Sequence, residues 1–184
     1  IYNNLYDRKD MNETVNKLGL KNSHFTNTMG DYGINHYSSA YDMAEILKYA
    51  LKNDKFKEVF TTKTYTLSTG KKLTSTLVGY NKSLGADISF ITGSKTGFID
   101  QAGYCLASTA TIDNVDYLLV TLNAFNDSSA HVKDSVTIYK YFGDNYGYKS
   151  IVSDNDVVVT LKTKFASEKQ IDIIAGYSKN KYWK

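Results

Sequence analysis

The chain has 184 residues, enough for one full core, or for one domain and the start of another. Hydrophobic residues make up 42% and charged residues 22%, as in ordinary globular proteins, and no apolar run approaches the ~20 residues that span a bilayer. The formal net charge of +3 comes without the Lys/Arg run that marks a nucleic-acid-binding surface. We therefore expect a globular protein with no nucleic-acid partner. The chain begins with Ile1 and without a basic leader, so we also expect a segment excised from a longer protein.

Apolar residues recur every three or four positions in three segments of the first sixty residues, which predicts helices. These segments are residues 7–18, residues 39–52 and a short turn over residues 56–60. The second has the clearest start, because Ser39 and Asp42 form a capping box. A polar connection over residues 20–37 joins the first two helices, and a loop of this length is usually functional or packed by its own side chains.

The middle of the chain predicts strands, because apolar and polar residues alternate between turn residues. Strands are expected over residues 62–67, 72–77, 91–98, 103–111 and 117–123. Residues 81–87 are expected to form a loop, and a helix over residues 128–142 should end at the glycines that follow it. The pattern predicts an α+β fold, in which this helix covers an antiparallel sheet of three main strands and the earlier helices form a companion region.

The pattern changes after Tyr148. Residues 157–161 and 171–174 predict two strands separated by polar residues, so we divide the chain into residues 1–149 and residues 150–184. Two or three strands rarely stand alone. We therefore expect the second region to be the start of a small β-rich domain whose apolar faces need a partner surface. That surface would come from the rest of the protein or from a second chain in a dimer.

The segment with the strongest chemical signal is Lys95-Thr96-Gly97, on the predicted strand 91–98. Lys-Thr-Gly is the third sequence motif of serine penicillin-binding proteins and β-lactamases, although a motif this short also occurs by chance. The Ala-Gly-Tyr sequence at residues 102–104 begins the next strand, which resembles the pattern of D,D-carboxypeptidases. On the motif alone, the alternative is an ordinary surface strand with Lys95 and Thr96 facing water.

A second block extends the resemblance toward the N-terminus. Residues 11–27 and the His-Tyr-Ser-Ser-Ala-Tyr-Asp sequence at residues 36–42 resemble serine D-alanyl-D-alanine carboxypeptidases, the low-molecular-mass penicillin-binding proteins of peptidase family S11. The match covers about residues 6–147. It departs at Thr28 and Ser39, where the family usually has proline and threonine. The resemblance implies that the sheet and its helices are part of a β-lactamase/transpeptidase-like fold.

The resemblance also implies a role for each motif residue. The family removes the terminal D-Ala from peptidoglycan stem peptides through a serine acyl-enzyme, and the same acylation captures β-lactams. Lys95 would place a positive charge near the substrate carboxylate and the acylation centre, and the Thr96 hydroxyl would donate to that carboxylate. Gly97 would let an extended peptide approach the strand edge, and the Phe98 N–H would form half of an oxyanion hole.

The nucleophile is not expected within this chain. The family needs Ser-x-x-Lys at the start of a helix and Ser-x-Asn on a nearby loop, and both precede Met11 in chain order. Four strings match these spacings, but they lie in a hairpin turn or beyond the catalytic region, so we interpret them as chance. They are Ser68 to Lys71, Ser178 to Lys181, residues 153–155 and residues 178–180. We therefore expect the chain alone to be inactive.

Two other functions stay open at this point. One is a β-lactamase-like hydrolase, which the block at residues 11–42 and the C-terminal β region disfavour. The other is a non-catalytic fragment that binds or organises the cell wall. For the main interpretation, the expected partners are D-Ala-D-Ala peptides of peptidoglycan, with β-lactams in the complete enzyme. The expected location is extracytoplasmic, with membrane anchoring only through segments outside this chain.

The remaining reactive side chains predict structural roles. His36 is expected to fix its loop by hydrogen bonding, and His24 and His131 to be surface or structural residues. Cys105 lies in an apolar run and is expected to be a buried, inert thiol. No His/Cys/Asp spacing indicates a metal, and no phosphate loop or dinucleotide fingerprint indicates a cofactor.

Overall fold

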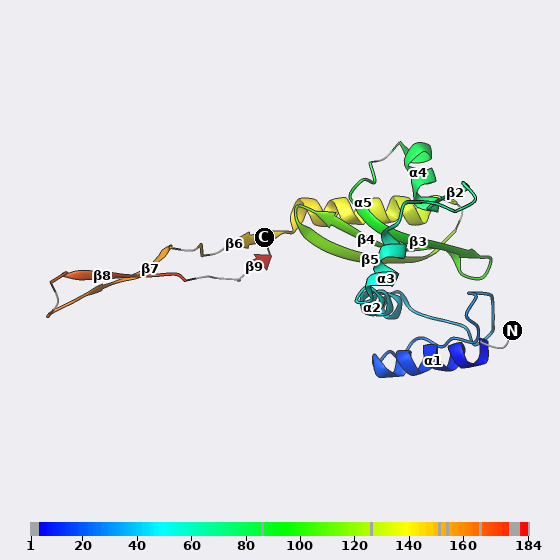
Figure 1. Ribbon diagram of the computed structural model, residues 1–184, viewed down its shortest axis with the longest axis horizontal. Helices are drawn as coiled ribbons and strands as arrows, with labels where there is room; N and C mark the ends of the chain where they lie inside the picture. Colours follow the sequence, from blue (N-terminus) through cyan, green and yellow to red (C-terminus); the bar gives the residue numbers. More distant parts are fainter. Residues whose placement is uncertain are drawn as a thin grey trace. The chain divides into compact units, whose positions relative to one another are not determined.

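The computed structural model of the chain describes residues 4–85, 87–125, 127–150, 152–153, 155–165, 167–176 and 181–183. The chain forms two compact units, Ile1–Lys140 and Tyr141–Lys184. The first unit holds a three-stranded sheet with helices packed on it, and the second holds short two-stranded sheets (Figure 1). Among the described helices, none combines the length and the apolar composition needed to cross a membrane.

The three predicted central strands form one antiparallel sheet in the order β3-β4-β5. They are β3 (Ile91–Ile99), β4 (Gly103–Ile112) and β5 (Val115–Ala124). The β4–β5 hairpin turns at Asp113 and Asn114, whose φ angles of 49 and 62 both lie in the left-handed region. Asp and Asn tolerate this conformation, which matches the right-handed twist of the flanking strands. The predicted α+β class and its antiparallel sheet are confirmed.

Helix α5 (Ala130–Asn145) covers one face of this sheet. Ile91 and Leu106 are fully buried in the core that the helix and the sheet share. Burying a side chain of this size stabilises a fold by about 1.5–3 kcal/mol. From the helix, the Tyr139 hydroxyl lies 3.0 Å from Ser108 Oγ, and burial raises the pKa of Tyr139 to about 12. The helix predicted at this position, covering the sheet, is confirmed.

The described residues of the first unit also form four further helices and one hairpin. The helices are α1 (Asn4–Lys17), α2 (Ala40–Ala50), α3 (Asp54–Thr61) and α4 (Thr76–Leu84), and the hairpin strands are β1 (Thr64–Thr66) and β2 (Lys72–Thr74). Helix α2 contacts β5 and β4, whereas α3 and α4 contact β3. The segment from α3 to α4 therefore borders the strand that carries the Lys-Thr-Gly motif.

Three predictions are wrong here: the end of one strand, one loop and the end of one helix. The sequence predicts a strand up to residue 77 and a loop over residues 81–87, but α4 occupies Thr76–Leu84. Leu77, Tyr80 and Leu84 recur at helical spacing and pack on the core, so tertiary contacts favour the helix. Helix α5 also continues through its first glycine to Asn145, because one glycine inside a helix costs only about 1 kcal/mol.

The long connection between α1 and α2 is packed by its own side chains. Asp42, which is 1% exposed, accepts hydrogen bonds from Asn22 N and Ser23 Oγ, both at 2.8 Å. Ser39 Oγ caps the helix by accepting from Asp42 N at 3.1 Å. The predicted capping box is therefore half correct, because the Asp42 carboxylate bonds the loop instead of the cap. His36 Nδ1 accepts from Thr26 N at 3.1 Å, which agrees with its predicted role in fixing the loop.

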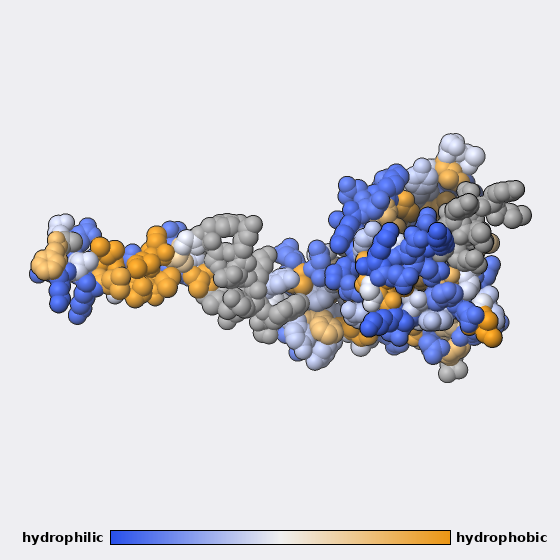
Figure 2. Space-filling model, turned by 90° about the horizontal axis from the view of Figure 1, so that it is seen from below, coloured by the Kyte–Doolittle hydropathy of each residue, from blue (hydrophilic) through white to orange (hydrophobic). Residues whose placement is uncertain are grey.

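The second unit consists of paired strands with exposed apolar residues. β6 (Tyr148–Ser150) pairs with β9 (Lys181–Trp183), which the sequence does not predict, and β7 (Val157–Lys162) pairs with β8 (Gln170–Ile174) near its predicted bounds. Figure 2 shows hydrophobic residues gathered along the middle of the β7–β8 hairpin, with hydrophilic residues around its tip. The compact units divide inside α5, whereas the domain boundary between residues 149 and 150 stays a prediction.

Candidate functional site

Strand β3 carries the whole Lys-Thr-Gly motif at the edge of the central sheet. Lys95, Thr96, Gly97 and Phe98 follow one another on it, and among the described strands β3 pairs with β4 alone. Its other edge is therefore not used by any described strand. A free strand edge presents backbone donors and acceptors that an extended peptide can pair with.

The register of β3 against β4 decides which face each motif residue occupies. Lys95 lies opposite Ala107 and Thr96 lies opposite Leu106. Directly opposed residues of an antiparallel pair share a face. Thr96 is therefore on the face that α5 covers and is half-buried, whereas Lys95 is on the opposite face and is exposed. The Thr96 hydroxyl makes no hydrogen bond to any described residue, so it is available to a ligand at the strand edge.

Backbone hydrogen bonds show which amides of β3 point away from β4. The Ile99 carbonyl accepts from Ala102 N at 3.1 Å and thus faces the turn into β4. The Thr96 carbonyl, three residues earlier, accepts from Lys95 Nζ instead. Backbone groups of an antiparallel strand alternate in direction, so Phe98 shares the outward direction of Thr96. The Phe98 N–H is therefore directed toward the free edge of the sheet.

The two glycines of β3 have different surroundings. A Cβ on Gly97 would meet no atom within 4 Å, so this chain leaves the space beside the motif open. A Cβ on Gly93 would lie 2.5 Å from Phe60 Cδ1, so only glycine lets α3 pack this closely on the strand. No sequence motif assigns Gly93 a role. A glycine inside a predicted strand is nevertheless a recognised signal of close approach.

A column of aromatic rings packs against Phe98 at the edge of the sheet. Its ring centroid lies 4.3 Å from that of Tyr104, and Tyr104 stacks on His131 at 5.5 Å. Tyr80 meets His131 edge-on at 5.4 Å. His131 is 1% exposed, its Nδ1 has no hydrogen-bond partner among the described residues, and burial lowers its pKa. Its role is structural, one of the two alternatives predicted, and its position beneath the motif could not be read from the sequence.

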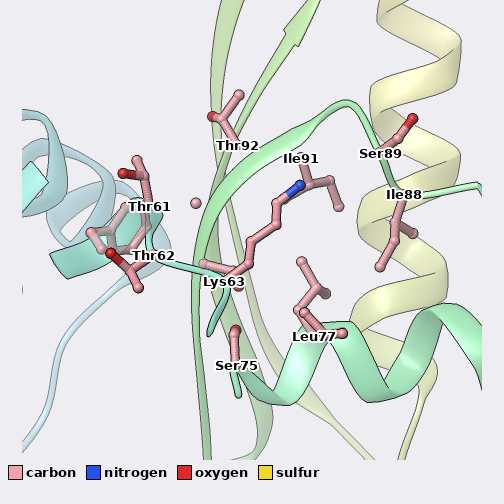
Figure 3. Close-up of a pocket in the computed structure, with 13 residues that line it drawn as sticks. Thr61, Thr62, Lys63, Ser75, Leu77, Ile88, Ser89, Ile91 and Thr92 are labelled. Atoms are coloured by element: carbon pink, nitrogen blue, oxygen red, sulfur yellow. The ribbon is translucent and has the colours of Figure 1, made fainter. Parts of the chain in front are cut away.

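A pocket of about 210 Å³ lies beside the first half of β3. Its walls come from three segments: the end of α3 and the residues after it, the start of α4 with Ser75 before it, and the loop before β3 with β3 itself up to Ser94. Among the described residues of the lining, Lys63 alone is charged, and its side chain extends across the middle of the pocket (Figure 3). Lys63 is not predicted as a site residue, because an isolated lysine between a helix and a strand belongs to no motif.

Other candidate residues do not assemble a second site. In the part of the chain that the structure describes, no three His, Cys, Asp or Glu side chains are placed to hold a metal ion. Cys105 is half-buried rather than buried, with Sγ 3.6 Å from the Ala102 carbonyl. Ser68 and Lys71 occupy the turn between β1 and β2, where no helix holds the lysine against the serine. Residue 154 and residues 178–180 of the other chance strings lie outside the described residues.

Comparison with known proteins identifies the segment that carries this site. Residues 8–126 match the family model of peptidase S11, described as D-alanyl-D-alanine carboxypeptidase. The D-alanyl-D-alanine carboxypeptidase DacF of Bacillus subtilis is 30% identical over 169 residues, which cover 90% of this chain and 42% of that protein. DacA of Escherichia coli K12, of the same description, is 39% identical over 103 residues, which cover 55% of this chain and 24% of that protein. The chain thus spans less than half the length of these relatives.

Solved structures agree on the fold. A mutant of the Streptomyces K15 DD-transpeptidase is 28% identical, with a TM-score of 0.60 over 73% of this chain and 53% of that one. Penicillin binding protein 5 from Haemophilus influenzae has a TM-score of 0.63 at 23% identity, over 89% of this chain and 46% of that one. At this lower identity the second likeness concerns the fold alone. Both place the β3-β4-β5 sheet and its helices in a DD-peptidase fold.

Proposed function

The chain belongs to the peptidase S11 family of D-alanyl-D-alanine carboxypeptidases, and from this premise we propose that the whole protein removes the terminal D-Ala from peptidoglycan stem peptides. It does so outside the cytoplasm, where it remodels the cell wall and binds β-lactams. The observation that carries the proposal is the free edge of β3, which holds Lys95, the Thr96 hydroxyl and the outward N–H of Phe98 within four consecutive residues.

Each of these groups has a task in acyl transfer. The substrate peptide pairs with the β3 edge at Gly97, where nothing in the chain blocks its approach. The Thr96 hydroxyl donates to the terminal carboxylate, and Lys95 contributes a positive charge beside it. The Phe98 N–H donates to the carbonyl oxygen as negative charge develops on it. The other half of the oxyanion hole is the N–H of the nucleophile itself.

The nucleophile belongs to a part of the protein outside this chain. Its serine hydroxyl attacks the penultimate D-Ala carbonyl, and its proton passes through a neighbouring base to the leaving amine of the terminal D-Ala. The peptide C–N bond breaks and an ester forms, which water then hydrolyses to restore the serine. Without that segment, the β3 edge positions a peptide but has no group to attack it.

The test uses the full-length protein and a synthetic peptide that ends in D-Ala-D-Ala and has its two amino groups blocked by acylation. We expect D-Ala release, and a stoichiometric adduct with a fluorescent penicillin by intact-mass analysis. Thr96→Val should lower kcat/KM by about 10- to 150-fold, since a hydrogen bond to a charged group contributes about 1.5–3 kcal/mol. Thr111→Val, which removes an exposed hydrogen bond to Asp116 on the neighbouring strands, is the matched control and should leave turnover unchanged.

The 184-residue chain is a second control, and we expect it to form no adduct. A full-length protein that neither releases D-Ala nor takes up the penicillin would contradict the proposal and favour a non-catalytic, wall-binding role. Unchanged turnover in Thr96→Val would reject Thr96 as the carboxylate donor while leaving the activity itself in place.

A further inference from the structure

The pocket of about 210 Å³ beside the first half of β3 is called the Lys63 pocket below. It ends where the Lys-Thr-Gly motif begins. Gly93 and Ser94 line it, and Lys95 is the next residue. Ser94 and Thr96 are two residues apart on the strand, so they share a face and lie about 7 Å from each other. A peptide whose carboxylate sits at Thr96 therefore ends at the mouth of this pocket.

The walls of the pocket are mainly apolar. Phe60 contributes from α3, Leu77 and Val78 from α4, and Ile88 from the loop before β3. Leu77 and Ile88 are 5% and 6% exposed and belong to the main core, so the floor of the pocket is fixed by the packing of the whole sheet. A fixed apolar floor selects a ligand group by its size and hydrophobicity.

Lys63 adds a positive charge to this apolar space. Figure 3 shows its side chain between Thr61 and Thr62 on one side and Leu77 and Ile88 on the other. Within the described residues, no carboxylate lies within ion-pair distance of its ammonium group. The hydroxyl of Ser75, at the start of α4, makes no capping hydrogen bond and also lines the pocket. The ligand that fits has an apolar side chain next to a carboxylate, which describes the C-terminal residue of a peptide.

The volume decides which C-terminal residue fits. A cavity of about 150 Å³ holds benzene. The pocket of about 210 Å³ is therefore large enough for a side chain of the size of leucine, methionine or phenylalanine, and the methyl group of alanine would leave most of it empty. Apolar contact with a matching pocket discriminates by roughly 10- to 200-fold for each methylene.

We propose that the Lys63 pocket receives the C-terminal D-residue of the substrate and that the protein therefore also releases D-amino acids with large apolar side chains. The carboxylate of the leaving residue lies between Thr96 and Lys63, and its side chain enters the pocket. This inference rests on the proposed carboxypeptidase activity and deepens it. The bond that breaks is the same peptide C–N bond, and the amine of the leaving residue takes the proton.

The experiment measures kcat/KM of the full-length protein on two diacylated peptides that differ only in ending with D-Ala or D-Leu. The quantity compared is the ratio of the D-Leu value to the D-Ala value, with the released amino acid measured by mass spectrometry. We expect a ratio of at least about 1. Ser75→Leu places a side chain in the pocket and should lower the ratio at least tenfold, because the leucine takes the space of the D-Leu side chain.

Ser75→Ala is the matched control, because it changes the same position without filling the pocket, and the ratio should stay within about threefold of the wild-type value. Val78→Phe fills the pocket from a second position and should repeat the effect of Ser75→Leu. Lys63→Gln should lower kcat/KM for both peptides together by about tenfold, whereas Lys57→Gln on the exposed surface of α3 should not. An equal loss of kcat/KM on both peptides would show that Lys63 acts on the carboxylate, which both peptides share, and not on the side chain.

The outcomes separate this inference from the activity on which it rests. Normal D-Ala release with a D-Leu to D-Ala ratio below about 1, or a ratio that neither filling variant changes, overturns the pocket assignment and leaves the carboxypeptidase in place. No release from either peptide, together with no penicillin adduct, removes the proposed function itself. If Ser75→Leu lowers D-Ala release because the protein is unfolded, Val78→Phe and the Lys63→Gln comparison still decide the assignment.

Discussion

Two antiparallel hairpins of this protein have similar strand patterns and opposite surroundings. In β4–β5, the inward residues Leu106, Ser108 and Ala110 are buried under α5. In β7–β8, the cross-strand pairs Val159 with Ile173 and Leu161 with Ile171 are 43–49% exposed. The opposite face of β7–β8 is polar, with Thr160 Oγ1 donating to Asp172 Oδ1 at 2.5 Å.

The difference shows that an alternating pattern specifies a face to be covered, not the element that covers it. The apolar face of β7–β8 has the composition of a core and has no covering element among the described residues. A two-stranded hairpin is marginally stable alone. We therefore predict that this face packs on another part of the complete protein or on a second copy of the chain.

The largest expected difference between the hairpins is in hydrogen exchange of the 184-residue chain. Amides of β4 and β5 should open only with global unfolding, which costs several kcal/mol, whereas β7 and β8 should open at almost no cost. Protection of the two hairpins should therefore differ by about 1,000-fold or more, measured by exchange at low protein concentration. Equal protection would show that β7–β8 is stable alone. Protection that rises with protein concentration would identify a second chain as the cover.

Two leucine-to-alanine substitutions, one in each hairpin, measure the same contrast as a difference in the free energy of unfolding. Leu106→Ala removes a fully buried side chain and should lower the free energy of unfolding by about 2–5 kcal/mol. Leu161→Ala, the same change at 49% exposure, should cost less than about 1 kcal/mol in this chain. Urea denaturation followed by circular dichroism gives both values. A loss at Leu161 as large as that at Leu106 would mean that β7–β8 already has a packing partner.

The aromatic column tests how far the covered sheet supports the candidate site. Tyr104 stacks between Phe98 and His131, so Tyr104→Ala should lower stability by about 1–3 kcal/mol, since each aromatic pair contributes about 0.5–1.5 kcal/mol. Tyr104→Phe keeps the ring and should cost less than about 0.5 kcal/mol. In the full-length protein, we expect Tyr104→Ala to lower kcat and Tyr104→Phe to restore it. A loss of stability without a change in kcat would separate the column from the oxyanion site.

The sequence predicts the elements whose signals are local. The three strands of the sheet, the Asp113-Asn114 turn and the Ser39 cap follow from alternation, turn preference and capping chemistry, and the structure confirms them. The motif Lys95-Thr96-Gly97 is also a local string, and its family is confirmed by residues 8–126.

The features that the sequence does not predict depend on contacts between distant segments. Helix α4 forms because Leu77, Tyr80 and Leu84 meet the core, and a helical stripe of three residues is too short a local signal to predict the helix without those contacts. The Asp42 carboxylate bonds Asn22 and Ser23, twenty and nineteen residues away, instead of its own helix cap. The Lys63 pocket exists only where three separate segments meet. Local preference cannot specify these arrangements because the free energy comes from tertiary packing.

The smallest effect that we predict concerns the protonation of His131, and it belongs to the first unit alone, since all three histidines of the chain precede residue 141. Burial lowers the pKa of His131, and the carboxylates of Asp127 and Asp134 oppose this shift without cancelling it. The unfolded chain therefore takes up a proton near the ordinary histidine pKa of about 6.5, whereas the folded protein does so only at lower pH. The stability that neutral His131 contributes is complete above about pH 6.5 and is lost as the pH falls through the folded pKa.

The urea midpoint should accordingly drop between pH 7.5 and pH 5.5, and it should drop less in His131→Phe, because the other titrating groups are common to both proteins. Identical midpoint shifts in wild type and His131→Phe would show that His131 is not the group responsible.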